Sequence, residues 1–439
     1  MGTQAHSTDE LLRLFDAGHG ICTDSRKVQP GDLYFALKGE RFDGNAYAQA
    51  ALDAGAVKAV VDDEALRGGA GMVWVEDGLQ ALQDLARAHR RRMTGTVIGL
   101  TGSNGKTTTK ELLYSVLSQR FRTHATQGNL NNHIGVPLTL LSMPLDTEVA
   151  IVEMGANHVG EIRELAEIAE PDLGLITNIG LAHLEGFGGP EGVKRGKREL
   201  FEFIARRPEG RVFVHAGQPV LLEVSEGQTR TLFGTPEHLP HATGLSDLPP
   251  DWDAPSAFLL HTPLGTTGPH ALHMDGGYNL DNALAALTVG AHLGVTWAEG
   301  LAGIASYRPT NNRSQWVVTP HNRVLLDAYN ANPSSMESAL RNFAAQQHHA
   351  PLVILGDMAE LGEYTAAEHR RILDLALELG LEAWTVGPAF AALERTDDGL
   401  SFDGPEALME ALDSAGVSSR TVLLKGSRSV QLEVALPLL

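Results

Sequence analysis

Runs of apolar residues alternate with amphipathic segments through the middle of the chain. Residues 96–101 (TVIGLT) are a β-branched apolar run that predicts a buried strand, and a helix is predicted to follow from about residue 106 to 118. Further strands are predicted over 149–153, 173–177 and 211–214, with helices over 160–169 and 194–204. Strand and helix repeated in this order predict a parallel sheet covered by helices on both faces.

The two ends of the chain show the same alternation. Before residue 93, apolar runs at 33–37, 57–61 and 72–75 and helices over 46–54 and 78–92 indicate a small α/β unit. After residue 309, four strands alternate with three helices, which predicts an independent, Rossmann-like doubly wound domain. We therefore predict an α/β protein with domains at 1–93, 94–309 and 310–439.

The stretch from about residue 218 to 275 departs from this pattern. It is rich in Pro, Gly, Thr and His, and its short polar–apolar alternations predict a few antiparallel edge strands. An amphipathic helix is predicted next, over 279–293.

Composition narrows the classes of function. The 439 residues are 43% hydrophobic and 20% charged, which is typical of a globular protein with more than one core. Lys and Arg number 34 against 54 Asp and Glu, and the net charge of −20 argues against a nucleic-acid or anionic-membrane partner. Cys22 is the single cysteine, so no disulfide can form within the chain. With no apolar span of about 18 to 20 residues, we expect a cytoplasmic monomer that does not insert into membranes.

A glycine-rich turn follows the strand at 96–101. It reads Thr101-Gly102-Ser103-Asn104-Gly105-Lys106-Thr107-Thr108 and precedes a helix, so its backbone N–H groups can converge on phosphate oxygens. Lys106 could then reach the outer phosphates, while the Thr107 hydroxyl ligates Mg2+. Leu100 stands where the common consensus has glycine, so the loop is a variant. An ordinary glycine turn is the alternative.

Polar residues also end the neighbouring strands. Glu153 closes one strand and could complete a magnesium site with Thr107, or be a solvent-exposed acid. His183 lies in a loop after the next strand, where it could bind a ligand or simply form hydrogen bonds. Lys197 lies in the basic segment GVKRGKRELF, whose simplest interpretation is a solvated helix face.

Two groups of amide side chains could bind a polar ligand. Asn131 and Asn132 belong to the loop QGNLNNH, which asparagine-rich turns would equally explain. Asn279 and Asn282 lie three residues apart at the start of a predicted helix, where either could instead be an N-cap.

Together these segments resemble the Mur ligases, ATP-dependent amide-forming enzymes of peptidoglycan synthesis. The resemblance spans nearly the whole chain. Its motifs are TDSRKVQPGDLYFALKGERFDG, TGSNGKTTTKE, NLNNHIGVPLTLL, VEMGANHVGEI, TNIGLAHLEGFG, KRELF, GYNLDNALAA, DAYNANPSSM, LGDMAELGE and KGSR. It implies an N-terminal uridine-nucleotide domain, a central P-loop ATPase domain and a C-terminal Rossmann-like domain.

The resemblance also implies roles for residues around ATP. The loop residues Gly102, Ser103, Asn104, Gly105, Lys106, Thr107 and Thr108 would bind its phosphates. Thr107 and Glu153 would hold one Mg2+, and His183 a second. Lys197 falls where the family carries a carbamylated lysine, which is an anionic oxygen ligand. Asn279 and Asn282 match adenine-site asparagines, Asp327 would meet the ribose, and Arg313 the γ-phosphate, although Asn311-Asn312 replaces the usual Pro-Gly before it.

The remaining implied residues concern the other substrates. Ser25 and Arg26 fall in the uridine-nucleotide motif, and Asn131 and Asn132 in the muramoyl-peptide loop. Tyr329, Asn330 and Asn332 would lie beside an incoming dipeptide.

The implied reaction joins D-alanyl-D-alanine to UDP-N-acetylmuramoyl-tripeptide with hydrolysis of ATP, through an acyl phosphate. DAYNANPSSM and GNLNNHIGVPLTLL favour this branch. The alternatives are a ligase that adds the third amino acid, a folate polyglutamylating enzyme, or a P-loop nucleotide switch. The switch would leave Lys197 and two domains without a purpose.

Overall fold

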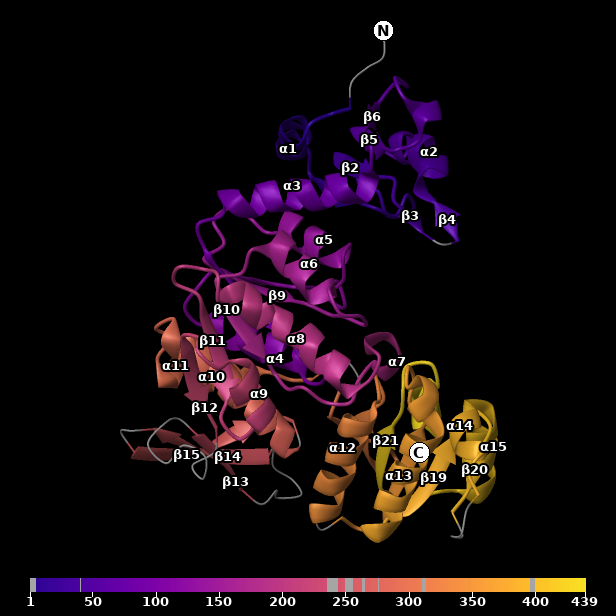
Figure 1. Cartoon of the computed structure of the whole chain (residues 1–439). Helices are drawn as coiled ribbons and strands as arrows, with labels where there is room; N and C mark the ends of the chain where they lie inside the picture. Colours follow the sequence, from indigo (N-terminus) through magenta and orange to yellow (C-terminus); the bar gives the residue numbers. More distant parts are fainter. Residues whose placement is uncertain are drawn as a thin grey trace.

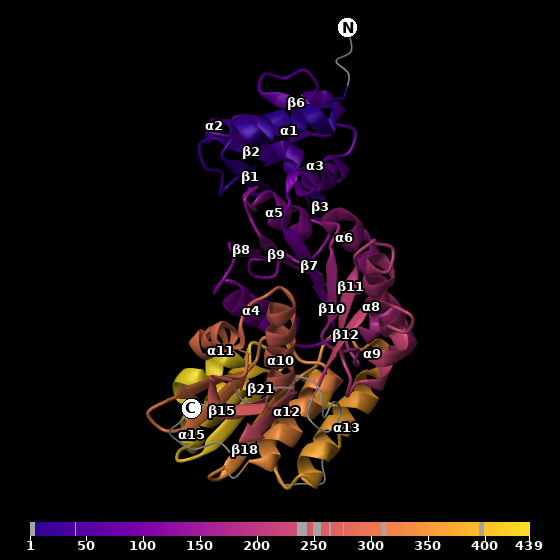
Figure 2. The same ribbon diagram turned by 90° about the vertical axis from the view of Figure 1, so that its left-hand side faces the viewer.

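Three α/β bodies follow one another along the chain and are stacked from the N-terminal to the C-terminal body (Figures 1 and 2). This computed structural model describes residues 5–39, 41–234, 244–248, 256–262, 265–274, 276–309, 313–346, 348–394 and 399–439. The predicted α/β class with parallel sheets is confirmed. The boundaries after residues 93 and 309 stay predictions. Residues 310–312, which include Asn311-Asn312, lie outside the described part.

The N-terminal body is a four-stranded parallel sheet in the order β1-β2-β5-β6. Side chains alternate along β2, so Leu33 and Phe35 pack under α1 and α3 on one face while Tyr34 packs against α2 on the other. The elements are β1 (Gly20–Cys22), β2 (Asp32–Phe35), β5 (Lys58–Val61), β6 (Met72–Trp74), α1 (Thr8–Ala17), α2 (Ala48–Asp53) and α3 (Gly78–Arg92), with a small hairpin of β3 (Lys38–Gly39) and β4 (Phe42–Asp43).

The central body is a six-stranded parallel sheet in the order β12-β11-β10-β7-β9-β8. The strands are β7 (Thr96–Thr101), β8 (Thr123–Ala125), β9 (Val149–Glu153), β10 (Leu173–Ile176), β11 (Arg211–His215) and β12 (Arg230–Phe233). Alternate residues of β7 face opposite sides, so Ile98 and Leu100 pack with α4 and α10 while Val97 packs with α5, α6 and α8. The predicted two-sided cover is therefore confirmed. Its helices are α4 (Lys106–Leu117), α5 (Gly135–Leu141), α6 (Glu161–Ala169), α7 (Leu184–Phe187), α8 (Pro190–Ile204), α9 (Pro219–Val224), α10 (Gly277–His292) and α11 (Trp297–Ser306).

Two expectations for the middle of the chain were wrong in detail. The predicted strands are antiparallel as expected, but they form a separate sheet and not an edge of the central one. They are β13 (Gly244–Leu248), β14 (Ser256–Thr262) and β15 (Gly265–Leu272). The helix expected to be amphipathic, α10, is buried continuously from Asn282 to Gly290, because it packs between α4, α11 and the strand layer. Neither it nor any other described helix is both long and apolar enough to cross a bilayer.

The C-terminal body has a six-stranded sheet in the order β16-β17-β21-β18-β19-β20, parallel except for the edge pair β16·β17. Leu325 of β17 packs toward α12 and α13, whereas Val324 and Leu326 pack toward α15 and η4, so the predicted double winding is confirmed. The elements are β16 (Gln315–Val318), β17 (Arg323–Asp327), β18 (Pro351–Gly356), β19 (Glu382–Val386), β20 (Ser401–Phe402), β21 (Thr421–Lys425), α12 (Pro333–Ala345), α13 (Thr365–Glu378), α14 (Pro388–Ala391), α15 (Pro405–Ala415) and η4 (Leu432–Leu438).

Helix α3 joins the N-terminal body to the central one, along the boundary seen in Figure 1. Its side chains donate hydrogen bonds to backbone oxygens of the central body along its length: Gln83 to His133 (3.1 Å), Arg87 to Glu167 (3.1 Å) and His89 to Met143 (2.9 Å).

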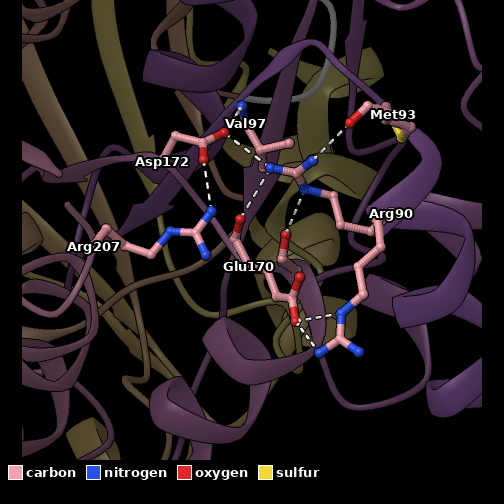
Figure 3. Close-up of polar contacts among 8 residues, drawn as sticks. Arg90, Met93, Val97, Glu170, Asp172 and Arg207 are labelled. Atoms are coloured by element: carbon pink, nitrogen blue, oxygen red, sulfur yellow. Dashed lines mark hydrogen bonds and ion pairs between the residues drawn. The ribbon is translucent and has the colours of Figure 1, made fainter. Parts of the chain in front are cut away.

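Arg90 is a buried cation in this joint (Figure 3). Its guanidinium donates to the carbonyl oxygens of Ala169 and Glu170, both at 3.1 Å, and to the Asp172 carboxylate at 2.9 Å. Because α6 ends at Ala169, this cation satisfies carbonyl groups at a helix C-terminus. Asp172 is held in turn by the N–H of Val97.

Replacing Arg90 with methionine should lower the free energy of unfolding by about 3 kcal/mol, because it leaves carbonyl groups at the C-terminal end of α6 without their buried donor. Arg91→Ala is the control: Arg91 pairs with Glu170 at the surface, so its loss should change stability by less than about 0.5 kcal/mol. Urea denaturation followed by circular dichroism measures both. Equal midpoints for the two variants would contradict this role of Arg90.

Candidate active site

The glycine turn after β7 has the tight conformation that a phosphate-binding loop needs. Gly102 has φ 151° and Gly105 has φ 76°, a region that favours glycine. A Cβ on Gly102 would lie 1.9 Å from Thr177 Oγ1, and one on Gly105 would lie 2.7 Å from Asn282 Oδ1. Asn178 fixes the turn from the next strand, because its Oδ1 accepts from the N–H of Asn104 at 2.9 Å. Only glycine fits at these two positions without displacing neighbours.

Lys106 begins helix α4 directly after this turn. Its Nζ folds back and donates to the carbonyl oxygen of Gly102 at 2.8 Å. Burial lowers the pKa of the Lys106 ammonium and Arg313 adds to this, while Glu153 opposes it. The Lys106 Nζ is therefore held against the glycine turn, beside the first helical turn of α4.

Glu153 is a buried carboxylate at the carboxyl end of β9, with 1% of its surface exposed. Its Oε1 accepts from Asn131 Nδ2 at 2.8 Å and from Thr107 Oγ1 at 3.3 Å. Its Oε2 is buried and, among the residues the structure describes, has no hydrogen-bond partner. A hydroxyl beside a carboxylate with a free oxygen is a donor set that fits Mg2+.

A cation held there would need further ligands from outside the chain. Within the described ranges, no three His, Cys, Asp or Glu side chains are grouped closely enough to hold a metal ion. Mg2+ commonly keeps waters and substrate phosphates in its shell, which suits this small protein donor set.

Lys197 is fully buried, so the solvated basic face suggested by its neighbours was wrong for this residue. In the part of the chain that can be described, its Nζ has no hydrogen-bond partner and lies 5.2 Å from the centre of the Phe187 ring. Burial, followed by the charge of Lys106, lowers its pKa well below the ordinary value, although Glu161 and Glu199 oppose this. By contrast Lys194 pairs with Glu223 on the outside of α8.

The amides at the start of α10 lie beside the same loop. Asn279 and Asn282 are both buried, and Asn282 Oδ1 accepts from Thr109 Oγ1 of α4 at 3.0 Å. The N-cap of α10 is Gly276, so the alternative that either asparagine caps the helix was wrong. The two loop asparagines make different contacts. Asn132 Oδ1 accepts from the N–H of Gly135 at 2.8 Å, as in an asparagine-rich turn, whereas Asn131 Nδ2 donates to Glu153.

The C-terminal body closes the other side of the site. Asn332 Nδ2 donates to Asn104 Oδ1 of the glycine turn at 2.7 Å, and Ser334 Oγ accepts from the N–H of Leu181 at 2.8 Å. His183 pairs through Nδ1 with Glu360 of the C-terminal body. In this arrangement, therefore, His183 Nδ1 links two bodies.

Two further groups of the C-terminal body face the same space. The Arg313 guanidinium lies 3.8 Å over the Tyr329 ring, which orients it. Asp327 accepts from Lys425 Nζ at 2.6 Å, and both residues are largely buried.

These groups line one cavity of about 770 Å3 between the central and C-terminal bodies. The predicted residues in its lining are Ser103, Asn104, Gly105, Lys106, Thr107, Thr108, Asn131, Asn132, Glu153, His183, Asn279, Asn282, Arg313, Asp327, Tyr329, Asn330 and Asn332. Gly102 and Lys197 lie behind the lining. Ser25 and Arg26 lie apart from it, in the N-terminal body, where Arg26 is exposed and pairs with Asp24.

Sequence reasoning missed several polar residues around this site, and three of them make contacts described above. Lys425, Ser334 and Glu360 were each inside a recognised motif, but nothing in their spacing showed that they would meet Asp327, Leu181 and His183. The Ser334 and Glu360 contacts depend on how the two bodies are placed, and the Lys425–Asp327 contact depends on the pairing of β17 with β21. A local pattern contains neither.

Asp327→Asn should destabilise the C-terminal body by about 3 kcal/mol, because it leaves the Lys425 ammonium buried without a carboxylate. The double variant Asp327→Asn/Lys425→Met, in which no charge is left unpaired, should recover most of that loss. Thermal unfolding of both variants measures it. A double variant no more stable than the single one would show that the pair does not act through its charges.

Comparisons with known proteins agree along the whole chain. The Mur ligase family catalytic domain matches residues 18–90, the Mur ligase middle domain 100–290, and the Mur ligase glutamate ligase domain 312–428. A UDP-N-acetylmuramoyl-tripeptide--D-alanyl-D-alanine ligase of Bacillus subtilis (strain 168) is 34% identical over 430 residues, covering 94% of this chain and 92% of that protein.

Solved structures are similar over the same length. MurF from Acinetobacter baumannii superimposes with a TM-score of 0.85 at 32% identity, covering 99% of both chains. MurF ligase from Thermotoga maritima, solved in complex with ADP, has a TM-score of 0.86 at 28% identity and covers 97% of both chains. The chain belongs to the Mur ligase family.

Proposed function

We propose that this protein joins D-alanyl-D-alanine to the free carboxylate of UDP-N-acetylmuramoyl-tripeptide, with conversion of ATP to ADP and phosphate. The product is UDP-N-acetylmuramoyl-pentapeptide, a precursor of peptidoglycan. The names of the full-length relatives support the choice of substrates. One observation of this chain carries the proposal: a phosphate-binding turn and a buried carboxylate with a free oxygen face the C-terminal body across one cavity.

ATP is proposed to bind with its phosphates on the glycine turn. The backbone N–H groups from Gly102 to Thr108 and the N-terminus of α4 favour an anion there, and Lys106 can turn from the Gly102 carbonyl toward the outer phosphates. Asn279 and Asn282 would bind adenine, and Asp327 would bind the ribose. Arg313, whose guanidinium lies over the Tyr329 ring, would meet the γ-phosphate.

Thr107 and Glu153 would hold one Mg2+, and His183 and Lys197 would serve a second. Such ions neutralise phosphate charge and polarise the transferred phosphoryl group. His183 would have to exchange its present partner, Glu360, for the ion.

The tripeptide carboxylate must be activated before an amine can attack it, because a carboxylate oxygen is a poor leaving group. Transfer of the γ-phosphoryl group to the tripeptide carboxylate forms a carbonyl–oxygen–phosphorus link and releases ADP. The amine of D-alanyl-D-alanine then attacks the carbonyl carbon, loses a proton, and phosphate leaves with the former carboxylate oxygen. This chain contributes placement and charge: Lys106 and Arg313 hold anions that would otherwise repel one another.

Lys197 is proposed to be carbamylated. Its amine has no hydrogen-bond partner in the described part of the chain and its pKa is well lowered by burial, so the neutral form that adds to CO2 is favoured. The addition forms an N–C bond and releases one proton, and it converts a buried amine into an anionic oxygen ligand.

Residues for the other substrates are proposed from the family motifs in which they lie. Asn131 and Asn132 would contact the muramoyl-peptide, Tyr329, Asn330 and Asn332 the incoming dipeptide, and Ser25 and Arg26 the uridine nucleotide. We further propose that the protein acts as a monomer in the cytoplasm, a compartment that suits the free thiol of Cys22.

Phosphate release from ATP should require both UDP-N-acetylmuramoyl-tripeptide and D-alanyl-D-alanine, with pentapeptide as the product by mass spectrometry. Single amino acids and folate are the comparison substrates. Turnover with L-lysine, diaminopimelate or glutamate as the incoming amine would instead support another amide ligase of the family. Hydrolysis that needs no UDP-linked peptide would support a nucleotide switch.

Lys197→Ala should lower kcat at least a hundredfold, because the anionic ligand is lost. A short carboxylate such as acetate should restore part of the rate if the missing group is an oxygen anion. Lys194→Ala, on the exposed side of the same helix, is the control and should stay within twofold of the wild type. Full activity of Lys197→Ala would exclude the carbamate.

A further inference from the structure

The first turn of helix α6 lies at the cavity, and this turn has no N-cap side chain. Its N-cap is Gly160 at φ 101°, which has no side chain to accept the first N–H groups. Asn157, Glu161 and Leu165 of this segment line the cavity. Something else in the fold must hold this part of the cavity wall.

Glu199 of α8 provides the missing acceptor. Its Oε1 accepts from the N–H of Gly160 at 2.7 Å and its Oε2 from the N–H of Arg163 at 3.0 Å. The carboxylate is 2% exposed, and its negative charge lies at the positive end of the α6 dipole. Arg163, the nearest cation, is half exposed and 3.6 Å away, so the backbone contacts dominate.

Further hydrogen bonds connect α6 to the loop before it. Glu161 turns back and its Oε2 accepts from the N–H groups of Asn157 at 2.7 Å and His158 at 3.2 Å. Gly186 lets the loop pack closely, since a Cβ there would lie 2.4 Å from the Asn157 carbonyl oxygen. Fixing Gly160 therefore fixes Glu161, and Glu161 fixes Asn157.

This wall lies at the end of the cavity that faces the N-terminal body. Gln83 of α3 donates to Glu164 Oε1 at 3.2 Å and to the His133 carbonyl oxygen at 3.1 Å. If the uridine nucleotide binds the N-terminal body, as in the proposed function on which this step rests, the linked peptide must pass this wall to reach the glycine turn.

We propose that Glu199 is a positioning residue that fixes the cavity wall from Asn157 to Leu165 for the peptide of the UDP-linked acceptor. Glu199 is not among the residues that line the cavity. Its two oxygens hold α6 in register with α8, the helix that also carries Lys197. The peptide consequently meets a wall with a fixed place relative to the reacting carboxylate.

Glu199→Gln tests this without changing the size of the side chain. An amide offers one acceptor oxygen, so its NH2 group must face one of the two N–H donors and that contact is lost. We expect the KM for UDP-N-acetylmuramoyl-tripeptide to rise about tenfold, while the KM for ATP stays within twofold. Hydrogen exchange at residues 157–163 should be faster than in the wild type.

Two controls separate positioning from general loss of stability. Arg163→Ala removes only the half-exposed cation that lies 3.6 Å from Glu199 and keeps the backbone N–H. Asp172→Asn removes a carboxylate that accepts from the N–H of Val97 just before β10 (Figure 3). Both should keep all KM values within twofold, even though Asp172→Asn should lower the Tm by about 2 to 4 °C.

The outcomes are distinct. A wild-type enzyme that ignores the UDP-linked acceptor refutes the proposed function, and this inference with it. A wild type that needs the acceptor, together with an unchanged acceptor KM in Glu199→Gln, refutes the positioning role alone. An equal rise of the KM for ATP and for the acceptor, or the same rise in Asp172→Asn, would also refute it.

Discussion

A buried carboxylate must be paired, and the site is organised by the need to satisfy Glu153. One of its oxygens is held by Asn131 and Thr107, while the other has no partner among the side chains that the structure describes. An uncompensated buried charge costs several kcal/mol. Such a group persists where a cation completes it, and Thr107 in the first turn of α4 would supply a second oxygen for the cation proposed above. The carboxyl ends of parallel strands bring both residues to one edge of the sheet.

This constraint explains how an acidic protein can bind polyanions. The chain has a net charge of −20, yet the cavity offers phosphates a glycine turn, the start of a helix, Lys106 and Arg313. Local groups in a partly dehydrated cavity act more strongly than the screened charge of the whole surface. Net charge therefore excluded partners that need a broad basic face, and it did not limit ligands that are bound by a few buried groups.

Much of this arrangement was predictable because it is local. The run TVIGLT followed by GSNGK predicts β7, the turn and the start of α4 together, because β-branched residues favour a strand and the glycines allow positive φ. The burial of Lys197 was not predictable from its basic neighbours: it depends on α8 turning one face inward against Phe187 while Lys194 faces Glu223. Contacts between bodies, such as Asn332 with Asn104, depend on long-range placement and were likewise absent from any local pattern.

The two joints of the molecule differ in kind. Helix α3 attaches the N-terminal body through buried donors to backbone oxygens, whereas the C-terminal body meets the central one through single polar contacts around the cavity. The account is tested most directly by a crystal structure with Mg2+ and a non-hydrolysable ATP analogue. It predicts the triphosphate over residues 102–107 and a metal ion bound by Thr107 Oγ1 and Glu153 Oε2; a nucleotide bound elsewhere, or a Glu153 without a metal ion, would contradict it.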